Sequence, residues 1–182
     1  DHDLKRYPNE TKYCLKIDVK KFYPSINHEV LKKQFRRKFK DPDLLWLIDM
    51  LIDSLGDGKG IAIGSLFSQW AGNFNLSPFD HWLKEEKKVR FYYRYCDDIV
   101  ILSNDKKELH SLLREIKRYL KANLDLEVKE NHKVFPVDKQ GIDFIGYRHF
   151  RSYVLLRKST AKNLIRKMRD IKKKMDKGGK FT

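Results

Sequence analysis

The stretch that decides the fold is RFYYRYCDDIVILS, residues 90–103. Two runs rich in β-forming residues, 90–95 and 99–103, flank the short segment Cys96-Asp97-Asp98. This pattern predicts a β-hairpin that exposes both carboxylates together at its tip. Paired aspartates at a hairpin tip are often only part of a solvent-exposed turn. Other parts of the sequence must therefore show whether this pair is functional.

A third carboxylate ends another predicted strand. Residues 13–19 are rich in β-formers and carry Asp18 near their end, before a turn at Tyr23-Pro24-Ser25. Three carboxylates from two strands can converge, and their oxygens suit Mg²⁺. Two such ions can stabilise the attacking and leaving oxygens of phosphoryl transfer. We therefore expect Asp18, Asp97 and Asp98 to form one site.

Periodicity predicts the remaining elements. Short strands are expected near 124–129, 133–137, 142–145 and 153–156. Apolar residues at helical spacing predict a helix over 44–55 that is mostly buried and ends at Gly56-Asp57-Gly58. Ser159 or Thr160 is the expected cap of a last helix, which Gly178-Gly179 ends. The other predicted helices cover 28–39, 65–86 with an interruption at Pro78, and 106–122.

Charge points to a polyanionic partner. The chain of 182 residues has 40 Lys and Arg against 25 Asp and Glu, a net charge of +15, which favours nucleic acid. Residues 157–182 hold eleven Lys or Arg and two Asp, so +9 of that charge lies in this C-terminal segment, which contains the last predicted helix. Its residues expected to contact the nucleic-acid backbone are Lys162, Arg166, Arg169, Lys172 and Lys173.

Several classes are excluded by what the sequence lacks. No run of about 18 apolar residues occurs, and the first residues lack the apolar core of a signal peptide, so we expect a cytoplasmic protein without membrane contact. Cys14 and Cys96 are too few for a disulfide framework or a zinc site and are expected to be reduced thiols. No G-x-x-x-x-G-K-[ST] spacing supports a phosphate-binding P-loop near residues 56–64.

Residues 16–26, KIDVKKFYPSI, resemble the first catalytic motif of bacterial reverse transcriptases, and YCDD at 95–98 resembles the second. The similarity continues in order to Phe150. It implies an RNA-directed DNA polymerase with two Mg²⁺ ions, for which Mn²⁺ can substitute. The implied metal ligands are Asp18, the backbone carbonyl of Val19, Asp97 and Asp98.

Further motifs follow the same resemblance. Tyr23 falls at the steric-gate position that excludes ribonucleotides, and GIAIGSLFSQ at 60–69 resembles the motif that lines the nucleotide and template pocket, here with Ile63, Gly64, Ser68 and Gln69. Residues 141–147, GIDFIGY, are similar to the primer grip, with Phe144, Ile145, Gly146 and Tyr147. A loosely matched segment offers three candidates for the general acid that protonates pyrophosphate: Lys129, His132 and Lys133.

Two departures narrow the resemblance. Most of the family has Gln-Gly and Ser-Pro where this chain has Ile63-Gly64 and Ser68-Gln69, a pair similar to diversity-generating retroelement enzymes. Ile63 has neither donor nor acceptor, so an error-prone enzyme is expected. Only 17 residues precede Asp18, so the fingers are expected to be largely missing and this chain alone to be weakly active or inactive.

The resemblance implies an α+β polymerase palm of split βαβ type, a ferredoxin-like antiparallel sheet with helices on one face. Palm and partial fingers would occupy 1–156, and the basic helix at 157–182 would connect palm and thumb. Implied partners are an RNA template, a DNA or RNA primer, deoxynucleoside triphosphates and an accessory protein, in a bacterial or phage-encoded enzyme. The alternatives are a group II intron maturase, a retron enzyme, an abortive-infection polymerase, or a catalytically silent nucleic-acid-binding module.

Overall fold

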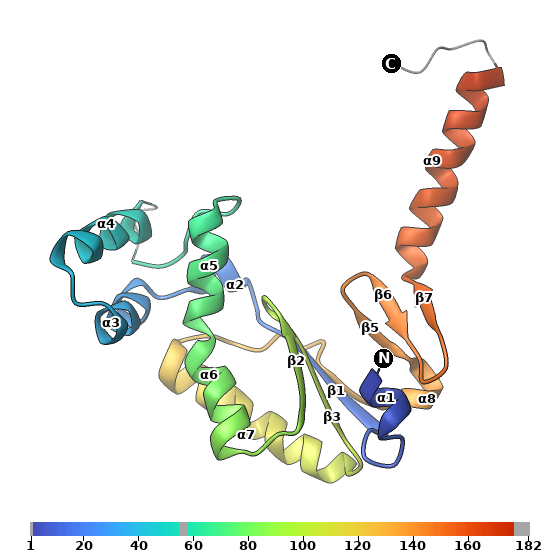
Figure 1. Ribbon diagram of the computed structural model, residues 1–182, viewed down its shortest axis with the longest axis horizontal. Helices are drawn as coiled ribbons and strands as arrows, with labels where there is room; N and C mark the ends of the chain where they lie inside the picture. Colours follow the sequence, from blue (N-terminus) through green and yellow to red (C-terminus); the bar gives the residue numbers. More distant parts are fainter. Residues whose placement is uncertain (1, 55–57, 177–182) are drawn as a thin grey trace.

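The computed structural model describes residues 2–54 and 58–176. It contains helices and short strands, with a central sheet and a projecting C-terminal helix (Figure 1). The elements are α1 (His2–Arg6), β1 (Tyr13–Asp18), α2 (Phe22–Ser25), α3 (His28–Lys38), α4 (Pro42–Asp53), α5 (Leu66–Asn75), α6 (Ser77–His81), the π-helical turn η1 (Trp82–Glu86), β2 (Phe91–Tyr95), β3 (Asp98–Ser103), α7 (Lys106–Leu124), β4 (Lys133–Pro136), α8 (Val137–Gln140), β5 (Ile142–Phe144), β6 (Tyr147–His149), β7 (Val154–Leu156) and α9 (Lys158–Asp176).

The central sheet is antiparallel, with strand order β2-β3-β1-β4. The register pairs Asp18 of β1 with Asp98 of β3 and continues to Tyr13 opposite Ser103. Side chains alternate between the two faces of a strand, so Asp18 and Asp98 share one face, whereas their neighbours Ile17 and Ile99 point to the other. The predicted hairpin and its acidic tip are confirmed.

The face that carries Ile17 and Ile99 packs on helices and forms the main core. Helix α7 follows the predicted period, and its buried residues are Leu109, Leu112, Leu113, Ile116, Leu120 and Leu124. The helix begins after Asp105, whose side chain accepts from the Lys107 N–H, and ends at Asp125, which has a left-handed φ of 53°. Helices α5 and α6 join the same core through residues such as Ala71 and Phe79.

On the other face, the described residues form an apolar cluster at one end. Leu4 of α1 and Val137 of α8 pack there with Cys14, Val100 and Leu102 of the sheet in a second, smaller cluster. Cys14 and Leu102 pair at the end of the sheet remote from Asp18 and Asp98. The acidic end of this face therefore keeps polar side chains, while the predicted α+β palm architecture, with its antiparallel sheet and its helical layer, is confirmed.

Two expectations about strands were wrong. Residues 124–129 do not form a strand, because α7 continues through Leu124 and only Val128 makes an isolated bridge, to Val19. In addition, Tyr147–His149 forms the unpredicted strand β6, which lies between β5 and β7 in a second, three-stranded sheet. A three-residue strand shows too few alternations for its period to be recognised.

The apolar spacing of helix α4 predicted a mostly buried helix, and this prediction was wrong. Only Ile48 and Ile52 are buried, whereas Trp46 is 64% exposed and Leu47 48% exposed. Among the described elements this helix packs mainly on α3, so only a narrow stripe of it is buried. Leu55, Gly56 and Asp57, on which the predicted end of this helix depended, lie outside the described residues.

The segment 65–86 is helical but divided, as predicted. Its break falls at Leu76, between α5 and α6, and Pro78 occupies the first turn of α6, where a missing N–H costs no hydrogen bond. The expected cap of the last helix was wrong, because α9 begins at Lys158 and contains Ser159 and Thr160. Gly178 and Gly179 lie outside the described residues.

Helix α9 extends away from the rest of the chain (Figure 1), and none of its described residues is buried. No described helix combines the length and the apolar character that crossing a membrane requires.

Two leucine truncations test this distribution of the core. Leu120 of α7 is fully buried, whereas Leu47 of α4 is 48% exposed. We expect Leu120→Ala to lower the free energy of unfolding by about 2–5 kcal/mol and Leu47→Ala by less than about 1 kcal/mol. Urea unfolding measures both. Equal losses would contradict the assignment of α7 to the core and of α4 to the surface.

Candidate active site

The three predicted carboxylates lie at one end of the central sheet. Asp18 is the last residue of β1 and faces Asp98, the first residue of β3. Asp97 lies in the two-residue turn between β2 and β3, where Cys96 has a left-handed φ of 50°. The Asp97 carbonyl accepts a hydrogen bond from the Val19 N–H at 3.3 Å. This bond brings Val19, the fourth predicted ligand, beside the hairpin tip.

Two lysines pair with the carboxylates. Lys129 Nζ lies 2.5 Å from Asp18 Oδ1, and this contact raises the pKa of Lys129. Lys16 Nζ lies 3.0 Å from Asp98 Oδ1. Each carboxylate is thus compensated by one ammonium group, since a buried carboxylate without a partner is costly.

Burial and mutual repulsion change the acidity of the hairpin carboxyls. Burial raises the pKa of Asp97, and the neighbouring Asp18 adds to the shift. Burial also raises the pKa of Asp98, although the hydrogen bond from Lys16 opposes it. Within residues 2–54 and 58–176, no three His, Cys, Asp or Glu side chains already stand close enough to hold a metal ion. The oxygen donors suit Mg²⁺, but ion pairs now engage them.

A cavity of about 550 Å³ opens beside these residues. Asp18, Asp97 and Asp98 line one side of it, and residues of the β5–β6 region line the other. Basic side chains from four segments of the chain also line it, namely Lys16, Lys133, Arg148 and Arg157. The cavity therefore combines carboxylates with cations, as a site for a phosphate ester and its counter-ions requires.

Tyr23 lies in α2, next to the hairpin tip. Its hydroxyl is 3.9 Å from Cys96 Sγ, and burial raises the pKa of Tyr23 to about 12. Gly72 of α5 lies directly behind the ring, since a Cβ at residue 72 would stand 3.0 Å from Tyr23 Cε1. The ring is therefore fixed by close packing on one side and faces the carboxylate end on the other.

The predicted pocket motif lies beside Tyr23. The Ile61 N–H donates to the Tyr23 carbonyl at 3.1 Å, and Ile63 is 76% exposed. Gly64 has a φ of 101°, which other residues rarely adopt. Gln69 is exposed, whereas Ser68 is buried and its hydroxyl bonds to that of Ser65.

The predicted primer-grip residues form the turn between β5 and β6. Ile145 and Gly146 both have a positive φ, and Ile145 and Tyr147 are about half exposed, at 50% and 47%. Phe144 lies under Lys16, whose Nζ is 5.9 Å from the ring centroid. Lys16 also donates to the Asp143 carbonyl, so one ammonium group joins this turn to Asp98.

The three general-acid candidates separate in the structure. Lys129 contacts Asp18 directly, as described above. His132 instead bonds to the Lys129 carbonyl through Nδ1 at 2.9 Å, with Lys117 Nζ 3.4 Å from its other nitrogen. Lys133 lies at the start of β4 and lines the cavity. The structure therefore brings only Lys129 against a carboxylate.

The basic residues of α9 are not brought to this site. Lys162, Arg166 and Arg169 are exposed on a helix that projects away from the sheet (Figure 1), as are Lys172 and Lys173. They form a separate basic surface along α9.

Three residues that shape the site were not predicted. Lys16 precedes Asp18 by two positions and so shares its face of β1, a signal that strand alternation carries. Arg94 pairs with Asp80 at 2.5 Å and donates to the Cys96 carbonyl at 3.1 Å, which braces the hairpin tip. Arg157 pairs with Asp143 at 2.6 Å, a contact that no local pattern indicates.

Comparisons with solved structures show the fold. A telomerase from Candida albicans, in complex with a TWJ fragment of telomeric RNA, matches with a TM-score of 0.64 and 15% identity, over 87% of this chain and 32% of that one. An apo telomerase from Candida tropicalis matches with a TM-score of 0.63 and 13% identity, over 85% of this chain and 34% of that one. At such identities the likeness concerns the fold alone.

Sequence comparisons give two curated relatives and one family. Protein YkfC of Escherichia coli (strain K12) is 21% identical over 180 residues, which cover 77% of this chain and 47% of that protein. A putative COX1/OXI3 intron 2 protein of Saccharomyces cerevisiae is 31% identical over 61 residues, or 33% of this chain and 7% of that protein. The chain thus spans less than half the length of either relative. The family described as reverse transcriptase (RNA-dependent DNA polymerase) matches residues 2–149, so this chain belongs to the reverse transcriptase family.

Proposed function

We propose that this chain carries the catalytic centre of an RNA-directed DNA polymerase that adds deoxynucleotides to a primer. The observation that carries the proposal is the register of β1 and β3, which sets Asp18 opposite Asp98 with Asp97 at the adjoining turn. Carboxylates from two separate strands meet beside a cavity of about 550 Å³ that also contains cationic side chains. Phosphoryl transfer needs this combination of metal-binding and phosphate-binding groups.

The residues divide the work among them. Asp18, Asp97, Asp98 and the Val19 carbonyl would hold two Mg²⁺ ions, with Mn²⁺ as a substitute. When bound, the ions supply Lewis acidity at the attacking and leaving oxygens. Lys129 is the favoured general acid among the three candidates, because its ammonium group lies 2.5 Å from Asp18, at the carboxylate end of the sheet where pyrophosphate would depart. Tyr23 and residues 60–69 would receive the nucleotide, and residues 144–147 the primer end.

Nucleic acid would be held by the wider basic surface. The exposed cations of α9 suit contacts to a phosphate backbone, which depend on charge and little on sequence. An RNA template and a DNA or RNA primer are the proposed partners, together with an accessory protein that supplies further binding surface. The Candida albicans telomerase of similar fold was solved with a fragment of telomeric RNA, which agrees with an RNA partner.

Within the family we favour a diversity-generating retroelement enzyme, bacterial or phage-encoded. The supporting observation is Ile63, whose side chain is 76% exposed at the pocket motif instead of packing in the core. The 61-residue similarity to a yeast intron protein favours an intron-encoded enzyme as the second candidate. Both candidates keep the same chemistry and differ in the RNA that is copied.

Asp97→Asn tests the catalytic assignment. The change removes one charged metal donor from the turn between β2 and β3 and leaves the side-chain volume almost unchanged. We expect turnover in primer extension to fall by roughly a thousandfold or more, because a bound metal contributes several kcal/mol to the transition state. Asp43→Asn, an exposed change in α4, is the matched control and should keep full activity. A fully active Asp97→Asn enzyme with Mg²⁺ would remove Asp97 from the site.

Replacement of Tyr23 tests the nucleotide gate. The ring is fixed against Gly72, so Tyr23→Ala opens space at the sugar, whereas Tyr23→Phe keeps the ring and removes only the hydroxyl. We expect Tyr23→Ala to raise incorporation of ribonucleotides relative to deoxynucleotides by about tenfold or more, since exclusion by volume is lost. Tyr23→Phe should leave the ratio near that of the wild type. If both variants keep the wild-type ratio, the ring has no gating role.

Ile63→Gln tests the link to error-prone synthesis. An apolar side chain cannot hydrogen-bond near the nascent base pair, and one such bond contributes about 0.5–1.5 kcal/mol. Gln at this exposed position should therefore lower misincorporation by roughly threefold to tenfold, provided that the bond forms to correct pairs. Sequencing of extension products measures the error rate. The same error spectrum in both enzymes would separate the motif from mutagenesis.

A further inference from the structure

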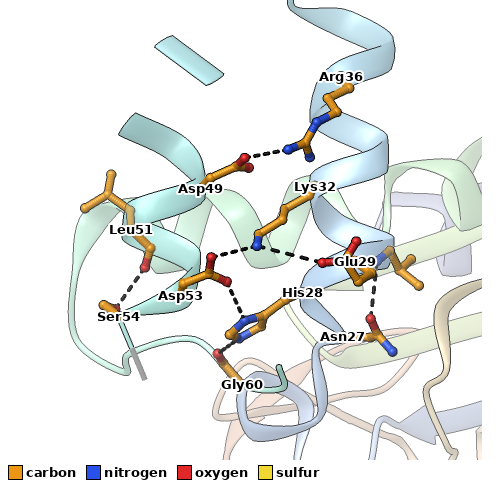
Figure 2. Close-up of polar contacts among 11 residues, drawn as sticks. Asn27, His28, Glu29, Lys32, Arg36, Asp49, Leu51, Asp53, Ser54 and Gly60 are labelled. Atoms are coloured by element: carbon orange, nitrogen blue, oxygen red, sulfur yellow. Dashed lines mark hydrogen bonds and ion pairs between the residues drawn. The ribbon is translucent and has the colours of Figure 1, made fainter. Parts of the chain in front are cut away.

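A buried histidine joins three segments beside the pocket motif (Figure 2). His28, the first residue of α3, is only 2% exposed. Its Nδ1 lies 3.0 Å from Asp53 Oδ1 at the end of α4, and its Nε2 lies 2.6 Å from the Gly60 carbonyl oxygen. Its backbone N–H also donates to the Gly58 carbonyl at 3.0 Å. One side chain thus connects two helices to the start of the pocket motif.

Both partners of the His28 ring are acceptors. Asp53 also receives a hydrogen bond from Lys32 at 2.7 Å, which lowers the pKa of Asp53, and His28 adds to that effect. The carboxylate is therefore ionised and, like the Gly60 carbonyl, can only accept. Both bonds exist at once only when each ring nitrogen carries a hydrogen. Asp53 and Lys32 therefore hold the imidazole in the orientation that points Nε2 at Gly60.

Gly60 is the point at which the pocket motif is fixed. Its N–H donates to the Ile26 carbonyl at 2.7 Å, and its carbonyl oxygen meets His28, so both of its backbone polar groups are engaged. Its φ is 89°, and a Cβ there would stand 3.2 Å from the Pro24 carbonyl oxygen. The next residue, Ile61, bonds to Tyr23. The backbone that leads to Ile63 and Gly64 is therefore anchored at Gly60, whose carbonyl oxygen is bound by His28.

We propose that His28 is a positioning residue for nucleotide binding, which acts through Gly60 to set the pocket motif relative to Tyr23. The inference rests on the proposed polymerase function. In this proposal the two hydrogen bonds of the ring have different roles. The bond from Nε2 to the Gly60 carbonyl orients the pocket motif, and the bond from Nδ1 to Asp53 orients the ring. A histidine that served stability alone would give the two bonds no such difference.

Two amide substitutions separate these bonds. His28→Gln places its amide nitrogen near the former Nε2 and can still donate to the Gly60 carbonyl. His28→Asn places its amide nitrogen near the former Nδ1 and can still donate to Asp53, but it leaves the Gly60 carbonyl without that donor. Each variant loses one buried hydrogen bond, so their melting temperatures should fall by similar amounts.

Steady-state primer extension with the full-length protein then measures KM for the nucleotide and kcat. We expect His28→Asn to raise the nucleotide KM about tenfold with kcat within about threefold of wild type, and His28→Gln to keep KM within about threefold. Equal KM values in the two variants would overturn the inference. If His28→Asn does not fold, His28→Gln decides alone, because a tenfold rise in its KM contradicts the assignment.

The wild-type protein distinguishes this inference from the function on which it rests. Addition of nucleotides by the wild type, together with equal KM values in both variants, rejects the role of His28 and leaves the polymerase assignment intact. Absence of Mg²⁺-dependent addition by the wild type rejects the proposed function, and the role of His28 is then rejected with it.

Discussion

The backbone pairing between β1 and β3 is the constraint on which the rest of the molecule depends. A shift of one residue in this register would turn Asp18 toward the helices and bring Ile17 to the polar face. The apolar side chains that pack on α7 prevent such a shift, because Leu15, Ile17, Ile99 and Ile101 are all buried on one side. The register that packs the core therefore also places the carboxylates.

Around that sheet, cations from separate segments balance the acidic end. Lys16 comes from the same strand as Asp18, whereas Lys129 comes from the segment after α7. Lys16 also reaches the carbonyl of Asp143 in the second sheet. Since each ion pair joins residues far apart in sequence, the central sheet and the segment after α7 must both be folded before the charges are compensated. The site is thus a product of the tertiary structure and of no single motif.

Strong local patterns made much of this architecture predictable. The acidic hairpin, the strand ending at Asp18 and the periodic stripe of α7 each combine several residues that favour one conformation. The errors have physical causes. Helix α4 has the spacing of a buried helix, but among the described elements it packs mainly on α3. The three-residue β6 is stabilised by neighbouring strands on both sides. The His28 contacts depend on long-range packing, which spacing alone does not encode.

The pair formed by Arg157 and Asp143 gives α9 a mechanical role. Arg157 immediately precedes this helix, bonds to the Gly146 carbonyl through its N–H at 2.9 Å, and pairs with Asp143 at 2.6 Å. The base of the helix is thus fastened to the β5–β6 turn, while its 19 residues extend for about 28 Å. Such a rod works as a lever, so a rotation of about 5° at its base moves its far end by roughly 2–3 Å. Under the proposed function, a force on nucleic acid bound along α9 would be transmitted to the β5–β6 turn.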